Sequence, residues 1–381
     1  MRVLFTVQGE GRGHFTQALA LREMLALRGH QVVGVVVGSN GTRPVPGYFT
    51  EAFDVPVRTM SSPGFVFKEA CGVSALASLT GNLRLLPACG RSLRRLRRLL
   101  RETAPDLVVN FLEPVMGLHN LLFGARIPTL VVGHQYMLEH PNFVEVPRYR
   151  AAQMLMRAYI RFVGARSTRL ALSFYPAPDV AESGLHVCPP LLRQQLFDLK
   201  STAGDYLLVY LLNHGYAAAV RRWHSMHPHI PVHCFYDRPG APAEERVQPN
   251  LTFHRLHGEK FLRFMAGARG VACTAGFESV SEAAYLGKPL LMVPVENHVE
   301  QFINACDAEQ AGIGVRDADF RLSRLLAANA KVASPEIRRW IDRAEIIALQ
   351  VVEAVAGLRS ASGLSAAVPS PVPALSREPA A

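Results

Sequence analysis

The segment CTAGFESVSEAAYLGKPLLMVPVENHVEQFINA, residues 273–305, decides the fold because its apolar runs and glycines follow the pattern of a strand–helix–strand unit. An apolar strand is predicted to end at Cys273, Gly276 opens a helix, Gly287 closes it, and KPLLMVP returns as the next strand. Such units build a parallel sheet with helices across its faces. The loop that holds Thr274 and Gly276 then offers backbone N–H groups and the positive end of a helix dipole, which suit a phosphate.

Carboxylates and amides follow this loop at positions that suit a nucleotide sugar. Glu278 and Glu282 are four residues apart and share a helix face. Glu282, one turn inside the helix, can accept two hydrogen bonds from a ribose diol, although solvated surface positions remain the alternative for both glutamates. The next loop and helix start bring Asn297, Glu300 and Gln301, which between them donate and accept hydrogen bonds, as sugar hydroxyls require.

A similar loop lies near the N-terminus, where GEGRGHFTQALAL (9–21) follows the predicted strand RVLFTVQ (2–8). Gly9, Gly11 and Gly13 have no Cβ, so a ligand can approach the backbone closely. The alternative is that these glycines serve only to make a tight turn. Their spacing departs from G-x-G-x-x-G, and the second strand ends in VVVGSN without the acid that would hold a ribose. The pattern therefore argues against a dinucleotide cofactor.

His14 falls in the first turn of the helix predicted at 14–28, where the helix dipole disfavours the protonated imidazole. A neutral imidazole suits a general base; the alternative is a histidine that only bonds the loop. Glu113, in NFLEP after another strand of this half, is hypothesised to orient His14. His134, in GHQY, is the rival base and otherwise an acceptor contact.

The rest of the chain alternates short apolar runs with stretches of helical period, which predicts two α/β halves in tandem. Strands are expected near 2–8, 31–37, 106–111, 128–132, 168–172, 206–212, 231–235, 251–254, 270–273, 289–293 and 313–315. The expected division is an N-terminal domain at 1–187, a linker at 188–204, a C-terminal domain at 205–334, one long helix at 335–357 and a disordered tail at 358–381.

Composition bounds the partners and the compartment. The formal net charge of +10 favours anionic partners. The six cysteines are far apart and form no CxxC pair, so reduced thiols in a cytoplasmic protein are expected. The N-terminus lacks the pattern of a secretory leader, and no apolar run approaches the roughly 20 residues needed to span a bilayer. Any membrane contact is therefore expected to be peripheral, at the inner face.

The motifs GEGRGH and GFESVSEAAYLGKPLLMVP, with EQFINA after them, resemble the nucleotide-sugar glycosyltransferases of the two-Rossmann (GT-B) architecture. The chain is similar to MurG-like enzymes and to the family 1 and family 28 superfamily, over residues 1 to about 357. The resemblance implies two Rossmann-like domains with a cleft between them and a C-terminal helix that crosses back to the N-terminal domain. It also implies ribose binding by Glu282, diphosphate binding from Gly276 through Ser279, and donor-sugar binding by Gln301.

The predicted reaction moves a hexose or N-acetylhexosamine from a nucleoside diphosphate sugar, with UDP favoured, to an acceptor hydroxyl, with inversion and without a metal or bound cofactor. His14 and Glu113 are the predicted catalytic residues. The predicted donor contacts are Asn213, His214, Gly215, Thr274, Gly276, Ser279, Glu282, Asn297, Glu300 and Gln301. The predicted acceptor contacts are Gly11, Arg12, Gly13, His134 and Gln135.

The segment RSLRRLRRLLRE (91–102) carries six arginines around an apolar stripe. A solvated helix face is one interpretation, and an anionic membrane surface that presents a lipid-linked acceptor is the other. Two functions of other classes also remain. One is a sugar-nucleotide epimerase on the same fold, and the other is a non-catalytic polyanion binder. Specific nucleic-acid binding is not expected, because aromatic residues are not interleaved with the basic run.

Overall fold

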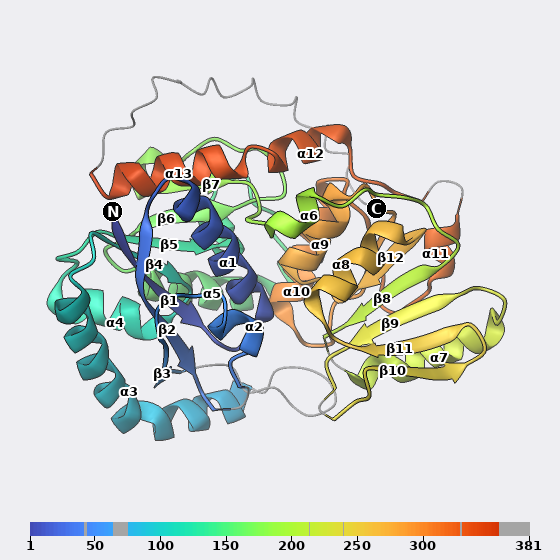
Figure 1. Cartoon of the computed structure of the whole chain (residues 1–381), viewed down its shortest axis with the longest axis horizontal. Helices are drawn as coiled ribbons and strands as arrows, with labels where there is room; N and C mark the ends of the chain where they lie inside the picture. The colour runs from blue at the N-terminus through green and yellow to red at the C-terminus, as the bar shows by residue number, and fades with distance from the viewer. Residues whose placement is uncertain (42–43, 64–74, 213, 239, 328–329, 358–381) are drawn as a thin grey trace.

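Each half of the chain builds its own seven-stranded sheet, and the two sheets lie side by side (Figure 1). The computed structural model describes residues 1–381 except 42–43, 64–74, 213, 239, 328–329 and 358–381; it also describes no side chains for 75–86. The predicted tail at 358–381 thus lies outside the described residues. The predicted α/β architecture is confirmed.

The N-terminal sheet is parallel throughout and has the strand order β3-β2-β1-β4-β5-β6-β7. Its strands are β1 (Arg2–Gln8), β2 (Gln31–Ser39), β3 (Val57–Ser61), β4 (Leu107–Phe111), β5 (Thr129–Gly133), β6 (Thr168–Leu172) and β7 (Leu185–Cys188). Every residue of β4 and β5 is buried. Burial on both faces explains why these strands are continuous apolar runs with no alternation.

The C-terminal sheet has the order β10-β11-β9-β8-β12-β13-β14 and is parallel except for the antiparallel pair of β10 and β11 at one edge. Its strands are β8 (Leu207–Leu211), β9 (Val232–Tyr236), β10 (Glu244–Gln248), β11 (Leu251–Arg255), β12 (Gly270–Cys273), β13 (Leu290–Met292) and β14 (Val315–Arg316). Strands β12 and β13 flank the helix that the opening motif predicts.

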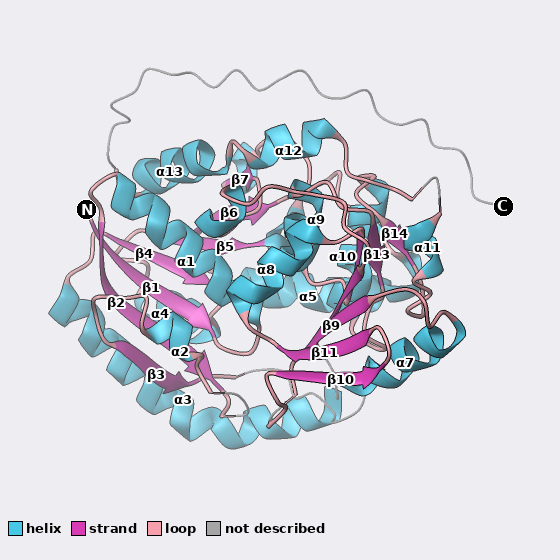
Figure 2. Cartoon of the chain, turned by 45° about the vertical axis from the view of Figure 1, so that its right-hand side comes forward, coloured by secondary structure: helices cyan, strands magenta, loops and turns pink. Residues whose placement is uncertain are grey.

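Helices cover both faces of each sheet (Figure 2). On the N-terminal sheet, α1 (Arg12–Leu27) and α13 (Ala344–Val355) lie on one face, and α3 (Ala75–Thr103), α4 (Pro114–Phe123) and α5 (Arg150–Val163) lie on the other. On the C-terminal sheet, α8 (Gly258–Gly267), α9 (Phe277–Tyr285) and α10 (Val299–Gln310) oppose α7 (Ala217–Met226) and α11 (Ser323–Leu326).

The strand orders place both predicted loops where the order of connection reverses. In the first sheet this point lies between β1 and β4, and in the second it lies between β8 and β12. Ligands of open α/β sheets bind outside the carboxyl ends of the strands at such points. The loop of residues 9–11 follows β1, and the loop of residues 274–276 follows β12.

Three strands are additional to those predicted. Strands β3 and β10 are edge strands, and both carry charged residues in place of an apolar run. Strand β7 and the short helix α6 (Gln194–Phe197) reach into the segment predicted as a linker. The neighbouring strand β6 supplies the ladder that makes LHVC a strand, and a local pattern cannot reveal that partner.

The C-terminal helix predicted at 335–357 is two helices, so the prediction of one continuous helix is wrong. Helix α12 (Pro335–Ile341) ends before a turn at Asp342 and Arg343, and α13 begins at Ala344. Helix α12 packs on α9 of the C-terminal half, whereas α13 packs on α1 and on strands of the N-terminal sheet. The turn lets the chain follow both surfaces as it crosses between the halves (Figure 1).

Candidate active site

The first glycine loop is shaped by close contacts within the protein. The Gly9 N–H donates to the Gly38 carbonyl at 2.7 Å, and a Cβ at Gly9 would lie 2.7 Å from the same oxygen. Gly11 is the N-cap of α1, and a Cβ at Gly13 would lie 3.2 Å from Cγ of Glu278. At Gly9 and Gly13 the absence of a side chain therefore lets the loop meet β2 and the opposite half of the protein.

His14 is buried in the first turn of α1. Burial lowers the pKa of His14, while the nearby Glu300 carboxylate and the Gln17 side chain raise it. Its Nδ1 is fully buried and has no aligned hydrogen-bond partner. The imidazole is therefore neutral near pH 7, which is the form that a general base needs.

Glu113 is the N-cap of α4 and is fully buried. One carboxylate oxygen accepts from Ser62 Oγ, and the other accepts from the Met116 N–H at 3.0 Å. Burial raises the pKa of Glu113 to about 7. These bonds go to its own half of the molecule and neither goes to His14, so no described contact supports the predicted orienting role.

His134 is held inside the protein by its surroundings. Its ring stacks on Phe277 with centroids 4.2 Å apart, and Nδ1 donates to the Leu172 carbonyl at 2.7 Å. Burial lowers the pKa of His134 to about 4. Its Nε2 lies 3.7 Å from Oδ2 of Asp307, a residue of the other half. The structure therefore places this rival base in a packed contact between the halves.

The second loop is bonded to itself and to β8. Gly276 is the N-cap of α9, and the Ser279 hydroxyl donates to the Gly276 carbonyl at 3.2 Å. The Thr274 hydroxyl accepts from the Leu212 N–H at 3.4 Å. These contacts fix the N-terminus of α9 at the end of β12, as the sequence predicts.

Glu282 makes a buried ion pair that the sequence did not reveal. Its Oε1 accepts from both Nε and Nη2 of Arg193, at 3.1 and 2.5 Å. A Cβ at Gly258, the first residue of α8, would lie 3.0 Å from Nη1 of the same arginine. Arg193 comes from the predicted linker, so this segment lines the site as well as joining the halves.

The remaining donor candidates divide into buried and exposed groups. Gln301 is buried and closes its own loop by accepting from the Val295 N–H at 2.9 Å. Asn297 is exposed, and its φ of 59° lies in the left-handed region. His214 and Gly215 are exposed in a short 3₁₀ turn after β8, and Asn213 lies outside the described residues.

Polar pairs join the two halves where both loops meet. Arg12 pairs with Asp237 at 3.0 Å, and Gln135 donates to Glu300 at 2.9 Å. Two further pairs join Gln17 to Glu278, at 2.7 Å, and Tyr175 to Asp307, at 2.9 Å. These pairs bring the N-terminal parts of α1, α9 and α10 together, whereas the hydrogen bonds of Glu113 stay within its own half.

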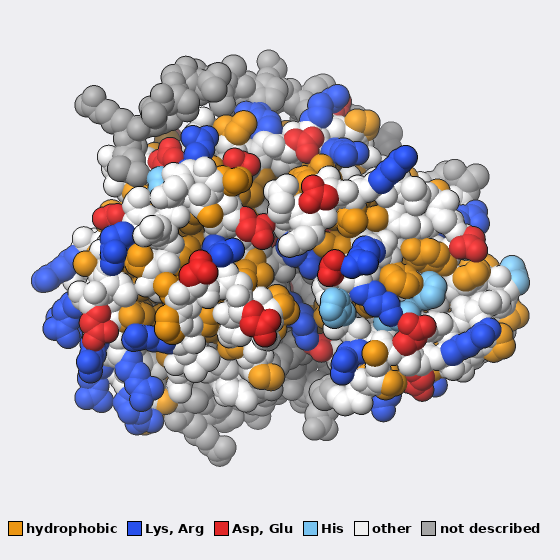
Figure 3. Space-filling model, viewed as in Figure 1, with side chains coloured by type: hydrophobic (Ala, Val, Ile, Leu, Met, Phe, Trp, Pro, Cys, Tyr) orange, Lys and Arg blue, Asp and Glu red, His pale blue; other side chains and the backbone are white. Residues whose placement is uncertain are grey.

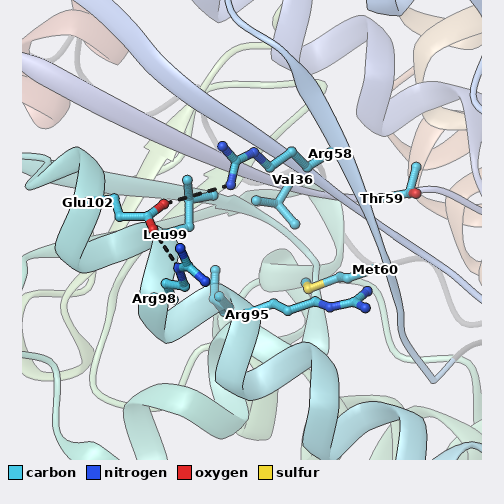
Figure 4. Close-up of a pocket in the computed structure, with 9 residues that line it drawn as sticks. Val36, Arg58, Thr59, Met60, Arg95, Arg98, Leu99 and Glu102 are labelled. Carbon is cyan, nitrogen blue, oxygen red and sulfur yellow. Dashed lines mark hydrogen bonds and ion pairs between the residues drawn. The ribbon is translucent and has the colours of Figure 1, made fainter.

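A cavity of about 390 Å³ lies elsewhere, between α3 and β3 (Figure 4). Val36, Met60, Leu96 and Leu99 form its apolar floor. Charged side chains also line it: Arg58, Arg95, Arg98 and Glu102. No predicted site residue contributes to its lining.

The family follows from a comparison with known proteins. A model described as glycosyl transferase family 1 matches residues 1–328. The chain belongs to glycosyl transferase family 1. This glycosyltransferase is 25% identical over 376 residues to an uncharacterized glycosyltransferase of Methanosarcina acetivorans, a match that covers 91% of this chain and 93% of that relative.

Solved structures show that the glycosyltransferase has the GT-B fold. It is similar to Acinetobacter baumannii MurG, with a TM-score of 0.54, 17% identity, and coverage of 93% of this chain and 99% of that one. It is also similar to Arabidopsis thaliana UGT89C1 in complex with UDP-L-rhamnose, with a TM-score of 0.60, 15% identity, and coverage of 93% and 98%. The glycosyltransferase assignment made from the motifs is confirmed.

The described part of the chain has neither a membrane-spanning helix nor a cluster of metal ligands. None of its helices combines the length and the apolar character needed to cross a bilayer. In the same residues, no three histidine, cysteine, aspartate or glutamate side chains are grouped so as to hold a metal ion.

Proposed function

We propose that this glycosyltransferase moves a hexose or N-acetylhexosamine from a UDP-sugar to an acceptor hydroxyl, with inversion and without a metal. The convergence of two helix N-termini carries the proposal. Helix α1, with His14 in its first turn, begins opposite α9, and the bond from Gln17 to Glu278 joins the second turn of α1 to the first turn of α9. A base from one half and an anion-binding helix end from the other are the two parts that glycosyl transfer needs.

In this proposal each half binds one substrate. Residues 1–187 bind the acceptor through Gly11, Arg12, Gly13 and Gln135, and residues 205–334 bind the donor. The complex of UGT89C1 with UDP-L-rhamnose supports a UDP donor, because that protein shares the fold. The donor contacts proposed within the described residues are His214, Gly215, Thr274, Gly276, Ser279, Glu282, Asn297, Glu300 and Gln301.

The proposed reaction is a single displacement. His14 takes the proton from the acceptor hydroxyl while that oxygen forms its bond to the anomeric carbon. The bond from this carbon to the diphosphate oxygen breaks, and the nucleoside diphosphate leaves with the electron pair. Backbone N–H groups at the start of α9 stabilise the charge on the leaving diphosphate. Direct attack from the face opposite the leaving group accounts for inversion.

Gly276→Ala tests the diphosphate site. Gly276 has φ −75° and ψ 138°, which alanine adopts readily, and a Cβ there would come no closer than 3.7 Å to protein atoms. The variant should fold normally but place a methyl group where the diphosphate approaches. We expect its affinity for the best nucleotide sugar to fall at least about 10-fold, or ~1.4 kcal/mol.

The donor is first chosen by thermal shift against UDP-, TDP-, GDP- and ADP-sugars with the bare nucleotides as controls, and calorimetry then measures its affinity. Gly90→Ala is the matched control, because a Cβ at that exposed helical position meets nothing within 4 Å. Unchanged donor affinity in Gly276→Ala would refute the proposed diphosphate site.

His14→Ala tests the base. Loss of a positioned general base should lower kcat by about 10²- to 10⁴-fold, with a much smaller effect on the KM for the donor. Turnover is measured as nucleoside diphosphate released in the presence of an acceptor alcohol. Product formed from the donor without an acceptor would point instead to an epimerase.

We further propose that the acceptor is lipid-linked and that the surface around α3 contacts an anionic membrane. The leucines of residues 91–102 pack on the sheet, whereas all six arginines are exposed. Lys and Arg side chains gather at the lower left of the molecule, over α3 (Figure 3). Helix α3 packs on α4, which ends in the exposed Leu121 and Leu122, and Arg97 lies over the Phe123 ring at 4.4 Å. Arginines beside exposed apolar side chains suit an anionic lipid surface.

Vesicle flotation with and without anionic lipid tests this surface. Arg97→Gln combined with Arg101→Gln should weaken binding to anionic vesicles by about 10- to 30-fold, since each basic residue contributes ~1 kcal/mol near such a surface. Arg338→Gln combined with Arg339→Gln serves as the control pair. Equal flotation with neutral and anionic vesicles would contradict the electrostatic part of the proposal.

A further inference from the structure

We propose that Gln17 and Glu278 position the His14 imidazole, through a hydrogen-bonded chain that crosses from α1 to α9. This inference rests on the proposed role of His14 as the base. Gln17 Nε2 donates to Glu278 Oε1 at 2.7 Å, and both side chains are buried or nearly so. His14 and Gln17 are three residues apart and therefore share a face of α1.

The bond to Glu278 fixes the orientation of the Gln17 amide. The carboxyl oxygen takes the NH₂ group, so the amide oxygen Oε1 is left to face other groups. Gln17 Oε1 and His14 Nδ1 are both fully buried without an aligned partner, and they belong to side chains on one face of α1. An Nδ1–H that donates to Gln17 Oε1 puts the lone pair on Nε2, where it can take the acceptor's proton.

The other candidates for this role are bound elsewhere. Glu113 bonds Ser62 and the N-terminus of α4, and Glu282 bonds Arg193. The Glu300 carboxylate raises the pKa of His14, but its Oε1 accepts from Gln135. Two described contacts link α1 to the donor half, Arg12–Asp237 and Gln17–Glu278, and Gln17 is the residue that shares a helix face with His14.

The surroundings of Glu278 explain why an acid is tolerated at the start of α9. Its Cγ packs against Gly13, and burial raises its pKa to about 8, so the carboxyl is neutral near pH 7. A neutral carboxyl turned toward α1 places no negative charge on the diphosphate site. Because Gln17 and Glu278 belong to different halves, the chain forms only when the halves meet, and the base is positioned in that arrangement.

Kinetics of single and double variants test the proposal. Gln17→Ala and Glu278→Ala should each lower kcat by about 10- to 100-fold, less than removal of the base itself, and change the KM for the donor less than about 3-fold. Glu278→Gln should restore most of the rate lost in Glu278→Ala, because its amide oxygen can still accept from Gln17. The Gln17→Ala/Glu278→Ala double variant should be no slower than the slower single variant.

The His14→Ala background separates positioning from a general structural effect. There, Gln17→Ala should cost no further rate, because no imidazole remains to be positioned. Gln17→Met, with circular dichroism as the fold check, replaces Gln17→Ala if the latter does not fold. Wild-type kcat in both alanine variants, or independent losses in the His14→Ala background, would overturn the positioning role. An active His14→Ala enzyme would instead overturn the proposed base.

Discussion

At the scale of single residues, Lys288 shows how one side chain joins separate segments. It is buried, and its Nζ donates to three backbone carbonyls, those of Thr202, Ala266 and Ala268, at 2.7, 2.6 and 2.9 Å. Two of these carbonyls lie at the C-terminal end of α8, where helical carbonyls lack intrahelical partners. The ammonium supplies three donors for three acceptors, so all are satisfied.

Lys288→Met should therefore destabilise the protein strongly. The substitution keeps an unbranched side chain of similar length but leaves the Thr202 and Ala268 carbonyls without their donor and the Ala266 carbonyl with the Thr202 N–H alone, at a cost of roughly 3 kcal/mol in free energy of unfolding. Urea denaturation followed by circular dichroism measures the change. Lys200→Met, at an exposed lysine, should stay within about 0.5 kcal/mol of the wild type. Equal stability of the two variants would contradict this account.

At the scale of elements, the C-terminal segment ties the halves together through α12 and α13. Trp340, near the end of α12, is buried, and its Nε1 donates to the Ser173 carbonyl after β6 at 2.9 Å. The ring packs in a cluster that contains residues of both halves, including Ile303 of α10 and Tyr136. The last element of the C-terminal half is thereby attached to the N-terminal sheet.

Trp340→Phe should weaken this attachment. Phenylalanine retains much of the apolar contact but leaves the buried Ser173 carbonyl without its donor, which costs about 1 to 3 kcal/mol. Differential scanning calorimetry should show a lower Tm. Ile346→Ala on α13, whose side chain is half exposed, is the control and should change the Tm less. The reverse order of the two variants would show that the indole hydrogen bond does not hold the segment.

At the scale of the whole molecule, a buried polar cluster lies between the halves. The Tyr175 hydroxyl donates to Asp307 Oδ1, and His134 Nε2 lies 3.7 Å from Asp307 Oδ2. Burial raises the pKa of Asp307 to about 7 and lowers the pKa of His134 to about 4. Both groups are therefore uncharged in the folded protein at slightly acid pH, as burial between the two halves requires.

This cluster makes stability depend on pH. Between pH 3.8 and about 7 the folded state retains the Asp307 proton that the unfolded state has lost, so this residue's contribution falls as pH rises. Between about pH 4 and 6.5 His134 acts in the opposite direction, because the unfolded state binds its proton more readily. Above pH 6.5 the Asp307 effect is no longer offset by His134.

Asp307→Asn removes the ionisation but keeps an oxygen that accepts from Tyr175. The Tm of this variant relative to wild type should therefore increase from pH 5 to pH 8. Asp54→Asn, at a side chain that is 99% exposed, should show no such trend. A difference that stays flat with pH would contradict the buried titration of Asp307.

The sequence by itself determined the repeating units of this protein. The spacing of apolar residues and the glycines at helix ends predicted the central strands, α1 and α9, and both loops at the strand ends. Buried parallel strands and helix termini can be recognised from such local patterns. Motif resemblance then led to the glycosyltransferase family. Edge strands β3 and β10 were missed because their partly exposed, charged sequences resemble loops.

Tertiary structure alone decided what each site residue contacts. Glu113 was paired with His14 in the prediction, yet its bonds go to Ser62 and Met116, and Glu282 faces an arginine 89 positions away. Gln17 and Glu278, 261 positions apart, meet because the N-terminal parts of two helices from different halves lie together. Local patterns reflect neighbours within about one helical turn, whereas contacts between halves depend on how the two sheets pack against each other.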